Sequence, residues 1–319
     1  GWHGAGAAEL TEAEALLLQG RIDEMDMPLQ KAYYQAEKHG QECITICCDF
    51  LEMQRDLFCG VYSSKAEAYS RQQWQLQPWK QSMLLNTADM CAGFYYALLG
   101  KPEYIPSWLT DENGQQPSVL YPARPCRNYI SAQCLLAQGQ YTELLVRWSD
   151  WEQECRPYSN FLCLLYLQVQ RAAAFAGRGD VTSCRASLKQ ALAMAAADKL
   201  VLPLAQNVAL LRPYLEQELQ GEFSAAAAAA LHLGQQLEAG RGQIMSSRFA
   251  EAGLQELTEQ ELQIAQLAAA RHTNREIAQR LSLSEGTIKQ YLNKIFAKLQ
   301  IDAAAKNKRH QLERFFPNS

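Results

Sequence analysis

Two amide residues and three lysines share one face of a helix that the sequence predicts at residues 285–299. The centre of this face holds Gly286, Gln290, Asn293 and Ala297, and it is flanked by Lys289, Lys294 and Lys298. No acidic residue follows Glu285 in the segment, whereas a solvated helix face usually mixes Glu with Lys. Small, amide and cationic side chains together can approach an anionic surface closely and hydrogen-bond to it. The alternative is a surface helix that happens to be basic.

The opposite face of the same helix is apolar and predicts how the basic face is held. Ile288, Leu292, Ile295 and Leu299 recur at steps of four, three and four residues. That spacing places them on one stripe of a helix with 3.6 residues per turn. We expect the stripe to be buried in a small core.

Two further helices are predicted just before this one, and each has a defined start. Thr258 with Glu261, and Thr273 with Glu276, form capping boxes, in which hydroxyl and carboxylate each satisfy a backbone N–H. Ser284 caps the third start. The expected helices are 259–271, 274–281 and 285–299. A short helix, a tight connection and a longer basic helix form the arrangement that places the second of the pair in the major groove of DNA.

Positive charge is concentrated at the C-terminal end of the chain, which favours an anionic partner there. The net charge is −4, but residues 258–319 contain ten Lys and Arg against six Asp and Glu, or +4. The remaining 257 residues therefore carry −8. A basic C-terminal segment on an acidic body favours a polyanion as partner of that segment alone.

The stretch "LTEQELQIAQLAAARHTNREIAQRLSLSEGTIKQYLNKIFAKL" resembles the LuxR-type (GerE-like) helix-turn-helix domain. The matching positions are Leu257, Thr258, Glu261, Asn274, Glu276, Ile277, Ala278, Ser284, Glu285, Thr287, Ile288, Lys289, Lys298 and Leu299. The chain departs from the family at Tyr291, where many members have His, and at Gln300, where Gly commonly follows "KL". The resemblance implies double-stranded DNA as partner, and it covers about a fifth of the chain.

The resemblance also implies roles for the residues of the basic face. Lys289, Gln290 and Asn293 lie where the recognition helix of the family reaches base edges. Lys294 and Lys298 are expected to contact phosphates, and Thr287 a phosphate near the helix start. The expected DNA-binding residues are Asn274, Ser284, Thr287, Lys289, Gln290, Asn293, Lys294 and Lys298. A single domain of this kind contacts only a few base pairs, so we expect a dimer on DNA.

The rest of the chain carries a ladder of glycines. Glycines stand at 20, 60, 100, 139, 179 and 221, so the steps are 40, 40, 39, 40 and 42 residues. Several end one helix-like apolar run and begin another, and glycine tolerates the left-handed backbone that such a turn requires. The pattern predicts helix-turn-helix units stacked into a TPR-like superhelix. A helical bundle with incidental glycines is the alternative.

These patterns predict an all-α fold with three parts: a TPR-like helical-repeat sensor domain at 1–239, a linker at 240–253 and a LuxR-type DNA-binding domain at 254–319. The linker is suggested by "AGRGQIMSSRFAEAG". A repeat domain before the LuxR-type domain is similar to the MalT-like subfamily, in which an ATPase part precedes the repeats. No G-x-x-x-x-G-K-[ST] motif is present, so we expect that ATPase part to be absent from this chain. The first residue is Gly and not Met, which suggests a piece of a longer protein.

Other classes of function find little support in the sequence. The five histidines are scattered, H-E-x-x-H and G-x-S-x-G motifs are absent, and the ten cysteines lack C-x-x-C spacing, so we expect no enzyme, metal site or cofactor. The longest uncharged run, Pro157–Gln170, is too short for a membrane span. We therefore expect a cytoplasmic transcriptional regulator whose repeat domain senses a small molecule or a protein. The alternative is a helical-repeat scaffold without specific DNA binding.

Overall fold

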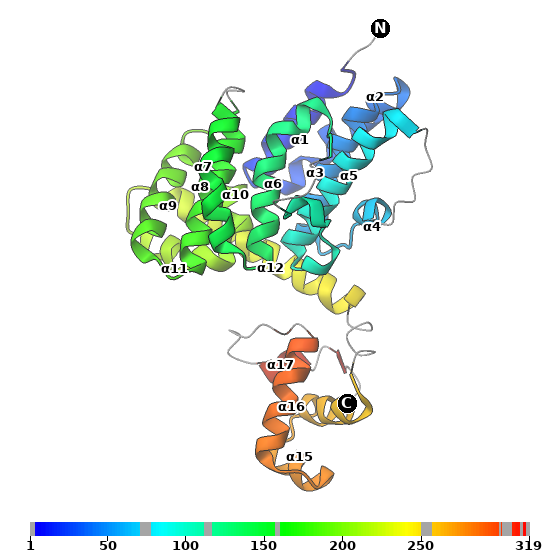
Figure 1. Cartoon of the computed structure of the whole chain (residues 1–319), viewed down its shortest axis with the longest axis vertical. Helices are drawn as coiled ribbons and strands as arrows, with labels where there is room; N and C mark the ends of the chain where they lie inside the picture. Colours follow the sequence, from blue (N-terminus) through cyan, green and yellow to red (C-terminus); the bar gives the residue numbers. More distant parts are fainter. Residues whose placement is uncertain are drawn as a thin grey trace. The chain divides into compact units, whose positions relative to one another are not determined.

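The structure is a computed structural model that describes residues 4–70, 78–111, 117–156, 160–249, 257–299, 301, 308–312 and 315–316. Within these ranges the regular elements are all helical, with no strand (Figure 1), so the predicted all-α fold is confirmed. The chain separates into two compact units, Gly1–Arg241 and Gly242–Ser319.

In its described residues, the first unit consists of α-helices joined by short turns and four 3-10 turns. In chain order the α-helices are α1 (Ala7–Leu18), α2 (Asp26–Lys38), α3 (Glu42–Cys59), α4 (Ser64–Ser70), α5 (Pro78–Leu99), α6 (Arg124–Ala137), α7 (Tyr141–Cys155), α8 (Phe161–Gly177), α9 (Val181–Ala196), α10 (Leu202–Gln206), α11 (Val208–Glu218) and α12 (Ser224–Ile244). The 3-10 turns η2 (Pro102–Tyr104), η3 (Ser107–Leu109) and η4 (Tyr121–Ala123) lie in the proline-rich segment between α5 and α6, and η1 (Ile22–Glu24) precedes α2.

The glycine ladder marks helix ends, as its spacing predicts. Gly20, Gly60, Gly100, Gly139 and Gly179 follow the ends of α1, α3, α5, α6 and α8, and each has a φ between 69° and 80°. An L-residue with a β-carbon rarely adopts this left-handed conformation, so glycine is the favoured residue there. Gly221 also lies between two helices, α11 and α12, but without a positive φ.

The helices α1 to α9 pack mainly against near neighbours in the chain. Each contacts the next helix, and α1, α3, α5, α6 and α8 also form a row in which each contacts the following one. Local contacts of this kind are expected for stacked helix pairs, in which one pair covers the apolar face of the next. The TPR-like nature of the stack remains a prediction.

The end of the first unit returns to its beginning. α10 contacts both α1 and α8, and its residues Leu202, Leu204 and Ala205 are fully or almost fully buried. Gln206 Nε2 donates to Gln54 Oε1 of α3 at 2.9 Å. Asn207 Oδ1 accepts from Gln133 Nε2 of α6 at 3.3 Å. The unit is therefore closed by long-range contacts, whereas the glycine ladder alone predicts mostly local ones.

The predicted linker at 240–253 is helical over its first ten residues. α12 continues through Gly240 and Gly242 to Ile244, and a π-helical turn, η6, follows at Met245–Phe249. Residues 250–253 lie outside the described ranges. Close packing explains why this helical position is a glycine. The α-carbon of Gly240 lies so close to α3 that a β-carbon would be 1.9 Å from the Leu57 carbonyl oxygen. The glycines that suggest a loop therefore include one required by close helix contact.

The second unit contains α14 (Glu259–Ala269), α15 (Asn274–Leu281), α16 (Glu285–Lys298) and the short α17 (Lys308–Leu312). The first three agree with the expected helices within two residues. α14 ends earlier than predicted, and the nearby Arg271 has a φ of 64°. Ile264, Ile277, Ile288 and Ile295 are fully buried in one apolar core. α16 packs on both α14 and α15, and α17 packs on α14.

The close approach of α12 to α3 gives a test of this packing. Replacing Gly240 by Ala should destabilise the first unit by about 1–3 kcal/mol, because the methyl group forces the two helices apart. The free energy of unfolding can be measured by denaturant titration of the full chain. Gly286 of α16 is the control, since its β-carbon would meet only Ser284 Oγ, at 3.7 Å. Gly286→Ala should instead be neutral or stabilising by about 0.4–1 kcal/mol. Equal effects of the two variants would contradict the contact.

Candidate nucleic-acid interface

The basic helix α16 is held by its apolar stripe and by a cap at its start. Ile288, Leu292 and Ile295 are at most 5% exposed. The Ser284 hydroxyl oxygen accepts a hydrogen bond from the backbone N–H of Thr287 at 3.0 Å, and the two hydroxyls are 2.8 Å apart. Ser284 and Thr287 therefore already have partners within the helix start. The stripe and the cap together fix which face of α16 is turned outward.

The outward face of α16 has the predicted composition. Gly286, Lys289, Gln290, Asn293, Lys294 and Ala297 are all exposed. The ammonium of Lys294 lies 5.8 Å from the ring centre of Tyr291, whose hydroxyl donates to Gln260 Oε1 of α14 at 2.9 Å. Tyr291, one of the departures from the family pattern, thus connects α16 to α14. The face presents two amides and two cations to the solvent.

Lys298 differs from the other lysines of α16. Its Nζ donates to Glu261 Oε2 at 2.6 Å, and the Glu261 side chain is only 5% exposed. The same carboxylate accepts the backbone N–H of Thr258 at 2.9 Å in the capping box of α14. Lys298 therefore joins the end of α16 to the start of α14. The predicted phosphate contact of Lys298 would require this ion pair to break.

The bonds at Glu261 affect its ionisation. The hydrogen bond from Lys298 and that from the Thr258 backbone hold the pKa of the Glu261 carboxyl below its ordinary value of 4.5. The charged carboxylate is therefore the form that the folded domain favours. Its contribution to stability is present above the ordinary pKa and is lost as the pH falls through the lower folded value.

Asn274, another expected DNA-binding residue, has an internal partner as well. Its Oδ1 accepts a hydrogen bond from the guanidinium of Arg309, which also donates to the carbonyl of His272. Burial lowers the pKa of Arg309. The pair ties α17 to the start of α15. Of the eight expected residues, Lys289, Gln290, Asn293 and Lys294 form the exposed face, whereas Asn274, Ser284, Thr287 and Lys298 take part in bonds within the unit.

α15 presents polar residues that the sequence analysis did not select. Arg275, Gln279 and Arg280 are exposed, and Arg280 Nη1 lies 2.9 Å from His272 Nε2. A signal for them exists in the sequence, because Arg275 and Gln279 are four residues apart and share one face of a helix that begins at a capping box. They add two guanidinium groups to the exposed cations of the helix pair.

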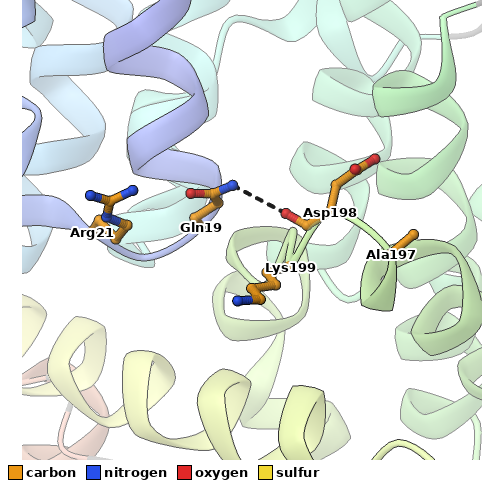
Figure 2. Close-up of a pocket in the computed structure, with 5 residues that line it drawn as sticks. All are labelled: Gln19, Arg21, Ala197, Asp198 and Lys199. Carbon is orange, nitrogen blue, oxygen red and sulfur yellow. Dashed lines mark hydrogen bonds between the residues drawn. The ribbon is translucent and has the colours of Figure 1, made fainter.

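The first unit contains a hollow between the ends of α1 and α9 (Figure 2). Gln19, Arg21, Ala197, Asp198 and Lys199 line its volume of about 630 Å³. Gln19 Nε2 donates across it to the Asp198 carbonyl oxygen at 3.3 Å, and Arg21 is paired with Glu24. The lining side chains are exposed or half-buried and carry both signs of charge. The hollow therefore predicts no particular ligand.

The part of the chain that the structure describes has neither a metal-binding cluster nor a membrane-spanning helix. Its His, Cys, Asp and Glu side chains form no group of three or more arranged to hold a metal ion. None of its helices combines the length and the apolar character that a membrane crossing requires.

Comparison with known proteins identifies the C-terminal unit. The family described as "Bacterial regulatory proteins, luxR family" (GerE) matches residues 255–306, which include α14, α15 and α16. Searches of curated proteins and of solved structures gave no match. The chain thus carries a luxR-family helix-turn-helix domain at its C-terminus, and this supports a DNA-binding transcriptional regulator.

The ion pair between Lys298 and Glu261 predicts that Lys298 and Lys294 of α16 differ in their effect on stability. Lys298→Ala should destabilise the C-terminal unit by about 1–2 kcal/mol, because it leaves the buried Glu261 carboxylate without its cation. Lys294→Ala should change stability by less than about 0.5 kcal/mol, since Lys294 is exposed. Denaturant unfolding of the full chain, followed by amide exchange in α16, measures both.

The pH dependence is the control for this test. Stability of the wild-type C-terminal unit should fall as the pH drops below about 4.5, and Glu261→Gln should reduce that fall. An equal loss of stability in Lys294→Ala and Lys298→Ala would show that the ion pair contributes nothing specific.

Proposed function

We propose that α16 is a recognition helix that reads base edges in the major groove of double-stranded DNA. The observation that carries this proposal is the outward face of α16, where exposed Gln290 and Asn293 lie between exposed Lys289 and Lys294. Amide side chains can pair with adenine edges and Lys with guanine edges. Gly286 and Ala297 are the small exposed residues of the same face. They allow the backbone of α16 to approach the groove closely.

Phosphate contacts are proposed for cations of both helices. When the second helix of such a pair enters the groove, the first crosses the DNA backbone. Arg275 and Arg280 of α15 are exposed and would meet phosphates in that geometry. Lys294 of α16 has the same role, and Thr287 remains a candidate near the helix start. Lys298 is assigned to the ion pair with Glu261 instead.

The first unit is proposed to sense an effector, either a small molecule or a protein. Support comes from its separation as a compact unit and from its row of stacked helices, which resembles repeat domains that bind partners. The MalT-like assignment stays a proposal on the same basis. We also propose a cytoplasmic location, where a DNA-binding regulator has access to its sites. A shift in the unfolding temperature on addition of candidate effectors tests the sensor role.

The second candidate is a helical scaffold that uses α14 to α16 to dock a protein. A helix that docks into a protein groove presents an apolar stripe to its partner. The apolar stripe of α16 is instead buried in its own unit, and its exposed face is polar and basic. DNA is therefore the better supported partner. Selection of bound sequences from a random duplex pool by the full chain decides between the two, because a scaffold enriches no sequence.

The amides and the lysine of the outward face of α16 have different proposed roles, and this difference gives a test of base recognition. Gln290→Ala and Asn293→Ala should each change which sequences bind, at about 1–3 kcal/mol per lost base contact. Lys294→Ala should weaken all sequences alike and reduce the slope of log K against log salt by about one. Binding isotherms on selected and scrambled duplexes at several salt concentrations measure these effects.

The matched control is Gln235→Ala, which removes an exposed amide from the first unit and should leave DNA binding unchanged. If Gln290→Ala and Asn293→Ala both keep the wild-type preference, α16 does not read bases.

A dimer on DNA is the last part of the proposal. One helix-turn-helix domain reads a short half-site, so specificity commonly requires two copies about one helical turn apart. We expect a footprint that covers two half-sites at saturation. Protection of a single half-site would contradict the dimer.

A further inference from the structure

Four helices of the first unit repeat the same three positions. Each has a cysteine, an aromatic residue three positions later and a longer buried side chain four positions after that. The sets are Cys47, Phe50 and Gln54 on α3; Cys91, Phe94 and Leu98 on α5; Cys126, Tyr129 and Gln133 on α6; and Cys163, Tyr166 and Gln170 on α8. The aromatic residues contact one another across the row, with ring centres 5.5 Å apart for Phe50–Phe94 and 5.7 Å for Phe94–Tyr129.

The register between α6 and α8 is fixed by two of these layers. The rings of Tyr129 and Tyr166 are stacked with centres 4.4 Å apart. Gln170 Nε2 donates to Gln133 Oε1 at 3.0 Å. Each pair is 37 residues apart in the sequence, and so are Cys126 and Cys163. The same register therefore places these two thiols opposite each other at the start of both helices.

A third thiol completes the cluster. Cys163 interacts with the thiols of both Cys126 and Cys155, and Cys155 is the last residue of α7. Cys155 Sγ also lies 3.9 Å from the carbonyl oxygen of Pro125, the residue before Cys126. Three helices thus bring three sulfur atoms together. We call Cys126, Cys155 and Cys163 the thiol cluster.

The members of the thiol cluster differ in exposure. Cys155 and Cys163 are at most 1% exposed, whereas Cys126 is half-buried. A small oxidant from solvent therefore meets Cys126 first, and the thiol behind it is Cys163. The interactions with Cys126 and Cys155 raise the pKa of Cys163, so this residue keeps its proton while the cluster is reduced. A reachable thiol backed by an enclosed one is the arrangement of a sulfenic acid and its resolving cysteine.

We propose that the thiol cluster is an oxidation site at which a hydroperoxide converts Cys126 and Cys163 into a disulfide that links α6 to α8. This goes beyond the proposed function and does not rest on it. The Cys126 sulfur attacks one peroxide oxygen; the S–O bond forms, the O–O bond breaks, and the alcohol or water leaves with the thiol proton. Cys126 is then a sulfenic acid.

The second step closes the disulfide. The Cys163 sulfur attacks the Cys126 sulfur, the S–S bond forms and the S–O bond breaks. The proton of the Cys163 thiol joins the departing hydroxide as water. In sum, two thiols and one hydroperoxide give one disulfide, one alcohol and one water, with the two sulfurs oxidised and the peroxide reduced.

The test uses the full chain with hydrogen peroxide as the oxidant. After oxidation, the remaining thiols are alkylated and the chain is digested without reduction, so that linked peptides can be identified by mass spectrometry. We expect a peptide pair joined through Cys126 and Cys163, which disappears after treatment with dithiothreitol. Cys126→Ser and Cys163→Ser should each abolish it. The control is Cys134→Ser, because Cys134 is also a buried thiol of α6 but contacts Gly93 of α5 instead.

Three results of the peptide analysis would overturn the proposal. The first is full alkylation of Cys126 and Cys163 while the exposed Cys43 and Cys59 are oxidised. The others are a linked pair of different cysteines and a loss of the linked pair in Cys134→Ser. If a variant fails to fold, the wild-type chain still gives an answer: oxidation should raise its melting temperature by roughly 5 °C, reversibly with dithiothreitol, because the cross-link closes a long loop. An unchanged melting temperature would contradict the cross-link.

Discussion

The carboxylate of Glu261 fixes the position of the basic helix. It accepts the Thr258 backbone N–H in the capping box of α14 and the Lys298 ammonium from the last turn of α16. Two helix ends that are distant in sequence are therefore held by one side chain. Between them the apolar stripe of α16 fills the core with Ile288, Leu292 and Ile295. The side chains that fix the orientation of the exposed face of α16 therefore lie outside that face.

Local signals in the sequence predicted most of the C-terminal unit. Capping boxes, the apolar stripe and the tight connection depend on residues within a few positions, and the three helices lie where these signals place them. The Lys298–Glu261 pair joins residues 37 positions apart, so helical spacing cannot reveal it. Within the predicted linker, Gly240 reflects close packing of α12 on α3, which local composition cannot reveal. Long-range packing, not local conformation, is what the sequence left open.

In the first unit, too, the sequence predicted local features but not long-range packing. Its glycine turns were predictable because a left-handed residue after a helix is a local requirement. The repeated positions of a cysteine, an aromatic residue and a longer buried side chain were not predictable. They recur at steps of 44, 35 and 37 residues and so do not follow the glycine spacing. They become visible only when α3, α5, α6 and α8 lie in one row. Two amides of that row, Gln54 and Gln133, bond to Gln206 of α10 and to the next residue, Asn207, and close the unit.

The number of lysines in α16 overstates the number of cations that its exposed face presents. Three lysines follow Glu285 in this helix, but the last is engaged with a buried carboxylate and supports the fold. The remaining two are exposed beside Gln290 and Asn293, and α15 adds Arg275 and Arg280. A helix that is basic by chance has no reason to keep its amides between exposed cations while its other cation is neutralised internally. The physical basis for reading α16 as a recognition helix is therefore the placement of each polar group, and not the net charge of the segment.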